Sequence, residues 1–272
     1  YIGSVQPSLT FMMIMLPMAG MLLPILILLF TFSTERSRRH PVFVLNVLTI
    51  LLGLTSAATN SYLTYMCIVF PSYHIPASTK LVNATILMLA PLFTDSVLLL
   101  RVVAFYPRAS TPFYVYAAVL SLPLVLKAGR LVAIIGFLIS LHANRDGSMN
   151  IIFSLHWPRN PWLMGEWSLQ VADNVYCTAF FLGKLYCFYQ RDGAQFLVRN
   201  ATLLSRVRAM FVIALSNFVF PLFFSVAQIT LTATQRFYEH GVQVMIANMY
   251  ANILGVLFAT VLASGRAWGR HE

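Results

Sequence analysis

Residues 9–32 read LTFMMIMLPMAGMLLPILILLFTF, a stretch that contains no charged residue. An α-helix rises about 1.5 Å per residue, so roughly 20 apolar residues are enough to cross the hydrocarbon core of a bilayer, which is about 30 Å thick. The stretch is also longer than the apolar core of a signal peptide. We therefore predict that these residues form a membrane-spanning helix.

The composition of the whole chain points the same way. Apolar residues make up 59% of the 272 positions and charged residues 10%, against about 25% charged residues in a typical soluble domain. Further apolar blocks follow the first, and the predicted spans are residues 9–32, 42–66, 81–105, 113–141, 166–190, 209–232 and 244–265. The sequence thus predicts an all-α membrane protein, a single seven-transmembrane helix bundle over residues 1–272. Because Lys127 and Arg130 interrupt the fourth block, a six-span chain is the alternative.

The basic residues of the short connections predict how the bundle is oriented. With the N-terminus outside, ten basic residues fall on the cytoplasmic side and four on the outer side. The cytoplasmic ones are Arg36, Arg38, Arg39, Arg108, Arg191, Arg199, Arg206, Arg208, Arg266 and Arg270, and the outer ones are Lys80, Arg145, Arg159 and Arg236. Because Lys and Arg are enriched in cytoplasmic loops, we predict an outer N-terminus and a cytoplasmic C-terminus.

Several function classes fit this sequence poorly. The formal net charge is +10, but the arginines are scattered between apolar blocks, so we expect no nucleic-acid partner. All six histidines lie at span ends or in loops, and no nucleophile with a neighbouring base falls inside a span, so we expect no enzyme, no metal site and no cofactor. The seventh predicted span has no lysine, which a retinal-binding pump needs for its Schiff base.

The entry to the second predicted span carries a motif. It reads Arg38-Arg39-His40-Pro41-Val42-Phe43-Val44-Leu45-Asn46 and resembles the basic-x-Pro-Ile-Phe-Ile-Ile-Asn signature of fungal alpha-factor-type pheromone receptors, the class D G-protein-coupled receptors. Basic residues suit the lipid headgroups, and Pro41 can begin a helix without the loss of an amide hydrogen bond. Asn46 puts one polar group inside the bundle.

Two later segments add to this resemblance. The sixth span contains Ser216-Asn217-Phe218-Val219-Phe220-Pro221, which is similar to the family's Gln-Ser-x-x-x-Pro, and the third inner loop, residues 191–208, is basic. Two features depart from the family pattern: the seventh span has no proline, and the first has Gly20 alone in place of a Gly-x-x-x-Gly pair.

The resemblance implies a multi-pass receptor of the plasma membrane, embedded in lipid, that binds a secreted peptide pheromone outside the cell. Such a receptor signals to a heterotrimeric G protein inside the cell, and a homodimer is compatible with it. From the residues alone, a small polytopic transporter or channel that uses mid-membrane charges is the alternative. A membrane scaffold without a ligand is a third reading.

Charged residues in the third and fourth predicted spans form one candidate site. Counted at 1.5 Å per residue, Asp95 lies about 20 Å below the outer end of its span, and Lys127 and Arg130 lie at a similar depth. An unpaired charge there costs at least a few kcal/mol, so we expect Asp95 to pair with Lys127 or Arg130. The pair could be a conformational switch, with Asn46 and a kink at Pro221, or a static buried ion pair.

Charged residues of the fifth predicted span suggest where a ligand would bind. Glu166, Asp173 and Lys184 fall within about 20° of one stripe of a helix, and this stripe should face into the bundle. Asp173 lies roughly two turns below the outer surface, where an extracellular ligand would reach it. We take Asp173, Glu166 and the span-six Asn217 as ligand-binding candidates. The alternative is that Asp173 only bonds a neighbouring helix.

Arginines at the inner ends of the spans are candidates for G-protein coupling: Arg36, Arg38, Arg39, Arg199, Arg206 and Arg208. They cluster next to the span that Pro221 would allow to move. The alternative is that they only set the topology and contact lipid phosphates.

The predicted orientation can be tested with a tag. A tag fused after Glu272 should stay unreactive toward a membrane-impermeant reagent on intact cells and react after permeabilisation. Labelling of this tag on intact cells would show that the predicted orientation is inverted.

Overall fold

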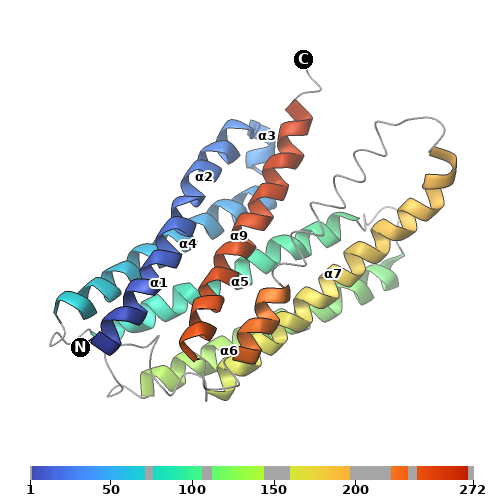
Figure 1. Ribbon diagram of the computed structural model, residues 1–272. Helices are drawn as coiled ribbons and strands as arrows, with labels where there is room; N and C mark the ends of the chain where they lie inside the picture. Colours follow the sequence, from blue (N-terminus) through green and yellow to red (C-terminus); the bar gives the residue numbers. More distant parts are fainter. Residues whose placement is uncertain are drawn as a thin grey trace.

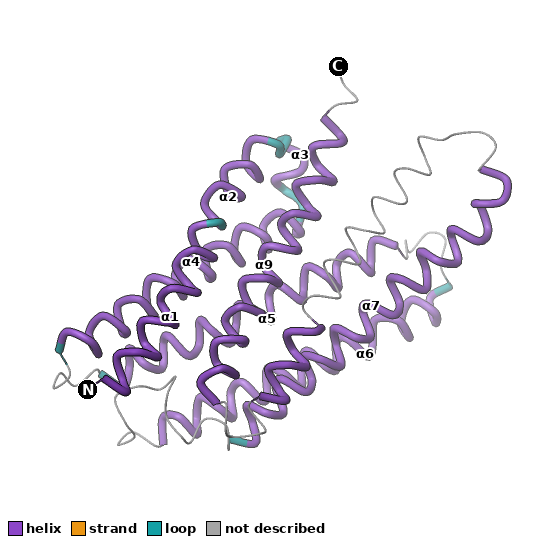
Figure 2. Tube along the Cα trace, in the orientation of Figure 1, coloured by secondary structure: helices purple, strands orange, loops and turns teal. Residues whose placement is uncertain are grey.

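The computed structural model describes residues 2–70, 76–105, 112–143, 160–196, 222–231 and 238–268. Within these ranges the chain is helical apart from short connections, and it contains no strand (Figure 2). The predicted all-helical class is therefore confirmed for the described residues.

The described helices overlap the predicted spans in order, with shifted ends, but residues 209–221 and 232 of the sixth predicted span lie outside the described residues. They are α1 (Ile2–Gly20), α2 (Leu22–Thr31), α3 (Glu35–Arg38), α4 (Pro41–Val69), α5 (Ala77–Phe105), α6 (Phe113–Ala143), α7 (Pro161–Phe196), an unlabelled helix Leu222–Leu231 and α9 (Tyr238–Trp268). The predicted span 9–32 is divided at Met21 into α1 and α2. α7 begins at Pro161 and not at the predicted residue 166, because the backbone N–H of Trp162 donates to Asn160 Oδ1 and a proline suits the first turn.

Four stretches of the described helices are long and apolar enough to cross a membrane. They are Leu9–Thr31, Pro41–Met66, Ala77–Leu100 and Tyr116–Ala143. The helix Leu222–Leu231 and the segment Gln243–Phe258 of α9 are shorter apolar helical stretches. α7 is as long as the others, but it carries charged and amide side chains along its length.

α5 lies at the centre of the bundle. It packs against α4 and α9 on one side and against α6 and α7 on the other (Figure 1). α6 runs alongside α7, and α1 packs against α4 and α9. In Figure 1, α1 and α9 run in the same direction, and α4 runs the opposite way. α5 therefore contacts α4, α6, α7 and α9.

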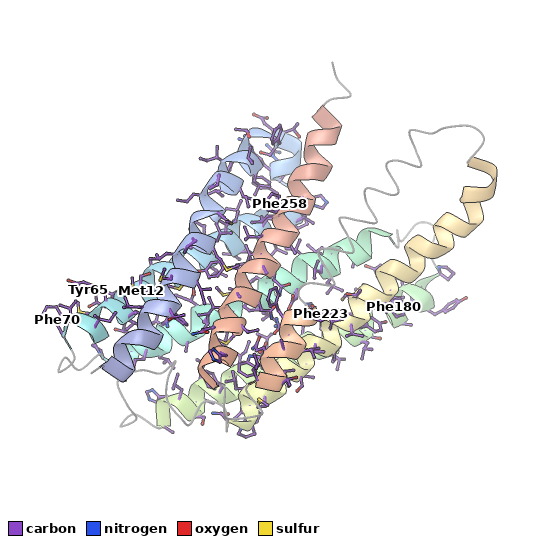
Figure 3. All side chains as sticks on the ribbon, viewed as in Figure 1. Met12, Tyr65, Phe70, Phe180, Phe223 and Phe258 are labelled. Atoms are coloured by element: carbon purple, nitrogen blue, oxygen red, sulfur yellow. The ribbon has the colours of Figure 1, made fainter. Side chains whose placement is uncertain are left out.

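The bundle is apolar outside and partly polar inside. Phe223 and Phe258, both labelled in Figure 3, are 75% and 52% exposed. Asn46, Asn60 and Asn248, by contrast, are buried. Many exposed large apolar side chains would be unfavourable in water and suit the hydrocarbon of a bilayer.

Two glycines allow helices to approach closely. A Cβ on Gly53 of α4 would lie 2.9 Å from Leu22 Cδ1, and the carbonyl oxygen of Gly53 accepts a hydrogen bond of 2.9 Å from the Tyr250 hydroxyl of α9. A Cβ on Gly136 of α6 would lie 2.5 Å from the indole ring of Trp162 at the start of α7. An indole ring is large and rigid, so Gly136 allows α6 and α7 to approach closely at this point.

We expect Gly136→Ala to destabilise the bundle by about 1–3 kcal/mol, as overpacking of a filled site does. Gly183→Ala is the matched control, because a Cβ on Gly183 of α7 would have no atom within 4 Å and alanine is the better helix former. Thermal melts in detergent should show a lower melting temperature for Gly136→Ala alone. Equal melting temperatures for the two variants would contradict the close contact.

Candidate functional site

Two basic side chains of α6 lie one turn apart and point into the bundle. Arg130 is fully buried and Lys127 is almost so, with exposures of 0% and 9%. Residues three apart on a helix share a face, and this face of α6 meets both α5 and α7.

Three carboxylates surround these basic groups and form with them what we call the charge cluster: Asp95, Lys127, Arg130, Glu166 and Asp173. Arg130 Nη1 lies 2.6 Å from Asp95 Oδ2 on α5, and Arg130 Nη2 lies 2.9 Å from Glu166 Oε1 on α7. Lys127 Nζ lies 2.8 Å from Asp173 Oδ2, which is also 3.8 Å from Arg130 Nη1. The cluster thus joins α5, α6 and α7.

The pairing confirms one expectation from the sequence and extends it. Asp95 pairs with Arg130, as expected, whereas Lys127 pairs with Asp173. Glu166 and Asp173 do lie on an inward-facing stripe of α7 and are buried. The charges predicted as an ion pair and those predicted as a ligand site therefore form one cluster, in which Asp173 bonds a neighbouring helix.

A cavity of about 20 Å³ adjoins the charge cluster at Glu166. Its polar wall consists of Glu166 and Gln170 from α7, Gln228 from the helix Leu222–Leu231 and Asn248 from α9. Apolar residues complete it: Leu87, Met88, Pro91, Trp167, Met245 and Met249. The volume is enough for about one water molecule.

Other polar contacts between helices were not anticipated from the sequence. Asn83 of α5 donates to Asn60 of α4 at 3.0 Å, and Asn248 of α9 donates to Ser225 at 3.0 Å. Asn46, a candidate switch residue, is buried and donates to Thr260 of α9 at 3.0 Å. Each of these residues is a polar residue inside an apolar block of the sequence. Such isolated polar residues are the sequence pattern from which these contacts could have been predicted.

The arginines proposed for G-protein coupling are described only in part. Arg38 donates to Ser33 Oγ at 2.8 Å and to the carbonyl oxygen of Phe30 at 3.1 Å, so it caps the end of α2 and is favoured there by the helix dipole. Arg39 is exposed. Outside the described residues, or with undescribed side chains, lie Arg36, Lys184, Arg199, Arg206, Arg208, Asn217 and Pro221.

Within the described part of the chain, no group of three or more His, Cys, Asp or Glu side chains could hold a metal ion. Cys177 is buried with a free thiol, and its Sγ lies 3.7 Å from Asp173 Oδ1. No family model matches the chain, and no curated protein or solved structure matches it either.

The charge cluster should behave as one energetic unit. Asp95→Asn leaves part of the Arg130 charge unpaired in the interior, so we expect a loss of about 3–5 kcal/mol of stability. Arg130→Gln should also destabilise, and the double variant should lose about 0.5–3 kcal/mol less than the sum of the two. Thermal melts of the four proteins measure this coupling.

Tyr250→Phe provides the control for this cycle, because it removes the hydroxyl that donates to Gly53 and leaves the cluster intact. Its effect should add to that of Asp95→Asn. If Asp95→Asn and Arg130→Gln were equally additive, the two groups would not be coupled.

Proposed function

We propose that this protein is a seven-span G-protein-coupled receptor of the plasma membrane that binds a secreted peptide, by resemblance a fungal mating pheromone. In this proposal the N-terminus lies outside and the C-terminus in the cytoplasm. The protein performs no chemistry on its ligand. It passes a change of helix arrangement from the outer face to a heterotrimeric G protein.

The helices give the proposal its first support. Four of them are long and apolar enough to cross a membrane. α7 and α9 are longer than a span requires, and their buried polar residues account for their lower hydropathy. The parallel course of α1 and α9 fits an odd number of crossings (Figure 1).

The motif at the start of α4 gives further support, because its residues act locally as the resemblance implies. α4 begins at Pro41, where a proline sacrifices no helical hydrogen bond. One turn further on, Asn46 is buried and bonds α4 to α9. The motif therefore joins the second span to the last.

The observation that carries the proposal is that Glu166 belongs both to the charge cluster and to the wall of the cavity. This residue belongs to the charge cluster that joins α5, α6 and α7, and it also lines the cavity shared with Gln228 and Asn248. Gln228 lies on the described helix Leu222–Leu231, and Pro221 precedes Leu222 in the sequence. A shift of that helix would change the surroundings of Glu166, which is the kind of link between helices that a receptor needs.

The same geometry argues against a solute path through the cluster. The charges are paired with one another at 2.6 to 2.9 Å, and the cavity beside them has room for about one water molecule. A transporter would need these charges to be open to its solute for at least part of its cycle.

A ligand screen with a G-protein reporter tests the proposal. The chain would be expressed in a host cell that lacks its own receptors for the panel, surface expression would be verified, and secreted peptides would be applied. We expect at least one peptide to activate the reporter with a saturable dose response. Solute flux in proteoliposomes, without reporter activation by any peptide, would favour the transporter.

The inner arginines offer a sharper test once a ligand is known. Lysine keeps the positive charge that sets topology but not the planar guanidinium, so Arg206→Lys with Arg208→Lys should keep surface expression and weaken G-protein activation. Ligand affinity should stay within a few-fold, because coupling between separate sites is typically about 1–3 kcal/mol. If the lysine variant and a well-expressed glutamine variant signalled equally, Arg206 and Arg208 would not belong to the surface that contacts the G protein.

A further inference from the structure

The charge cluster is one positive charge short. It contains three carboxylates, Asp95, Glu166 and Asp173, and two basic groups, Lys127 and Arg130. Among the side chains that the structure describes in this cluster, one negative charge is left over when every group is ionised. An uncompensated charge away from water is unfavourable, so the described cluster calls for one further positive charge.

The carboxylate beside the cavity has an oxygen to spare. Both contacts of Glu166 with Arg130 use Oε1, which leaves Oε2 for another ligand. Glu166 is also the one member of the cluster that lines the cavity of about 20 Å³. The unbalanced charge and the adjoining space therefore meet at the same side chain.

Gln170 points to an occupant of this cavity independently of the charges. Its side chain lines the cavity, Gln170 is only 4% exposed, and within the described part of the chain its side chain has no hydrogen-bond partner. An amide that faces an enclosed cavity can offer its oxygen to an occupant of that cavity. Gln170 is therefore a candidate ligand for such an occupant.

The proline inside α5 points to a backbone oxygen as a further candidate ligand. Pro91 lies inside α5 and has no N–H, so the carbonyl oxygen of Leu87 lacks its usual donor four residues later. Both Leu87 and Pro91 line the cavity. Carboxylate, amide and carbonyl oxygens are the ligands that hard cations such as Na⁺ prefer.

We propose that the cavity between α5, α7, α9 and the helix Leu222–Leu231 binds one Na⁺ ion. The ligands on the protein are Glu166 and Gln170, with Gln228 and the Leu87 carbonyl at the other walls. A single positive charge balances the cluster, whereas a divalent ion would reverse its excess. A cavity of about 20 Å³ admits an occupant no larger than about one water molecule, so a bare Na⁺ ion fits inside it and choline does not.

The test measures the melting temperature of the purified full chain in detergent, in NaCl, KCl or choline chloride at constant ionic strength. A ligand that binds only the folded state stabilises it in proportion to the logarithm of its concentration above Kd. We expect the melting temperature to rise by about 2–4 °C per tenfold increase in Na⁺, and less or not at all in K⁺ or choline. Binding of radioactive sodium to the same protein should saturate at one ion per chain.

Two variants and a control assign the effect to the cavity. Gln170→Leu removes the unpartnered amide but no member of the charge cluster, and it should weaken the dependence on Na⁺ at least tenfold. Glu166→Gln removes the excess negative charge and should abolish the dependence. Gln243→Leu is the control, because Gln243 lies on α9 outside the cavity, near His240, and it should respond to Na⁺ as the wild type does.

Equal melting curves in NaCl and choline chloride would overturn the proposal. If the melting temperature depended on pH instead, the missing positive charge would be a proton on a carboxyl group of the cluster. A Na⁺ response that Gln170→Leu leaves unchanged would also overturn it. Gln170→Leu keeps the test decisive even if Glu166→Gln does not fold.

Discussion

The buried guanidinium of Arg130 is the constraint on which the centre of this bundle depends. A fully buried arginine in an apolar bundle needs anionic partners in fixed positions, and Arg130 finds Asp95 on α5 and Glu166 on α7. Its fork of donors reaches two helices at once, which a lysine could not do in the same way. The relative positions of α5, α6 and α7 follow from this one side chain, with Gly136 allowing α6 and α7 to come close.

Much of the bundle could be predicted from the sequence because the hydrophobic signal of a span is strong. The uninterrupted residues 9–32 and the proline at the start of α4 needed no tertiary information. Matched depth also predicted that Asp95 would meet a basic residue of the next span. The choice between Lys127 and Arg130 could not be made, because it depends on how α6 is rotated about its axis, and packing against α5 and α7 determines that rotation.

The cavity could not be predicted, for a similar reason. Gln170, Gln228 and Asn248 come from three helices that are distant in the sequence, and each is an ordinary amide in an apolar block. Nothing in the local pattern says that they share a space. The break at Met21 was also missed, since residues 9–32 are apolar throughout and mark no boundary between α1 and α2.

The distribution of charge over α5, α6 and α7 bears on how the chain is assembled during synthesis. α6 carries both basic groups and is made after Asp95 but before Glu166 and Asp173. Each basic residue at the centre of a span opposes insertion by about 2.5–3.5 kcal/mol, so α6 carries this cost twice, and its apolar remainder and Asp95 on α5 can offset it. α7 is the less apolar helix and is made later, so its two acidic residues meet cations that are already in the membrane. Because α5 and α6 are synthesised first, their basic groups can pair with the acidic residues of α7 when it is made. This order favours the insertion of α7, the helix that is least able to enter the lipid alone.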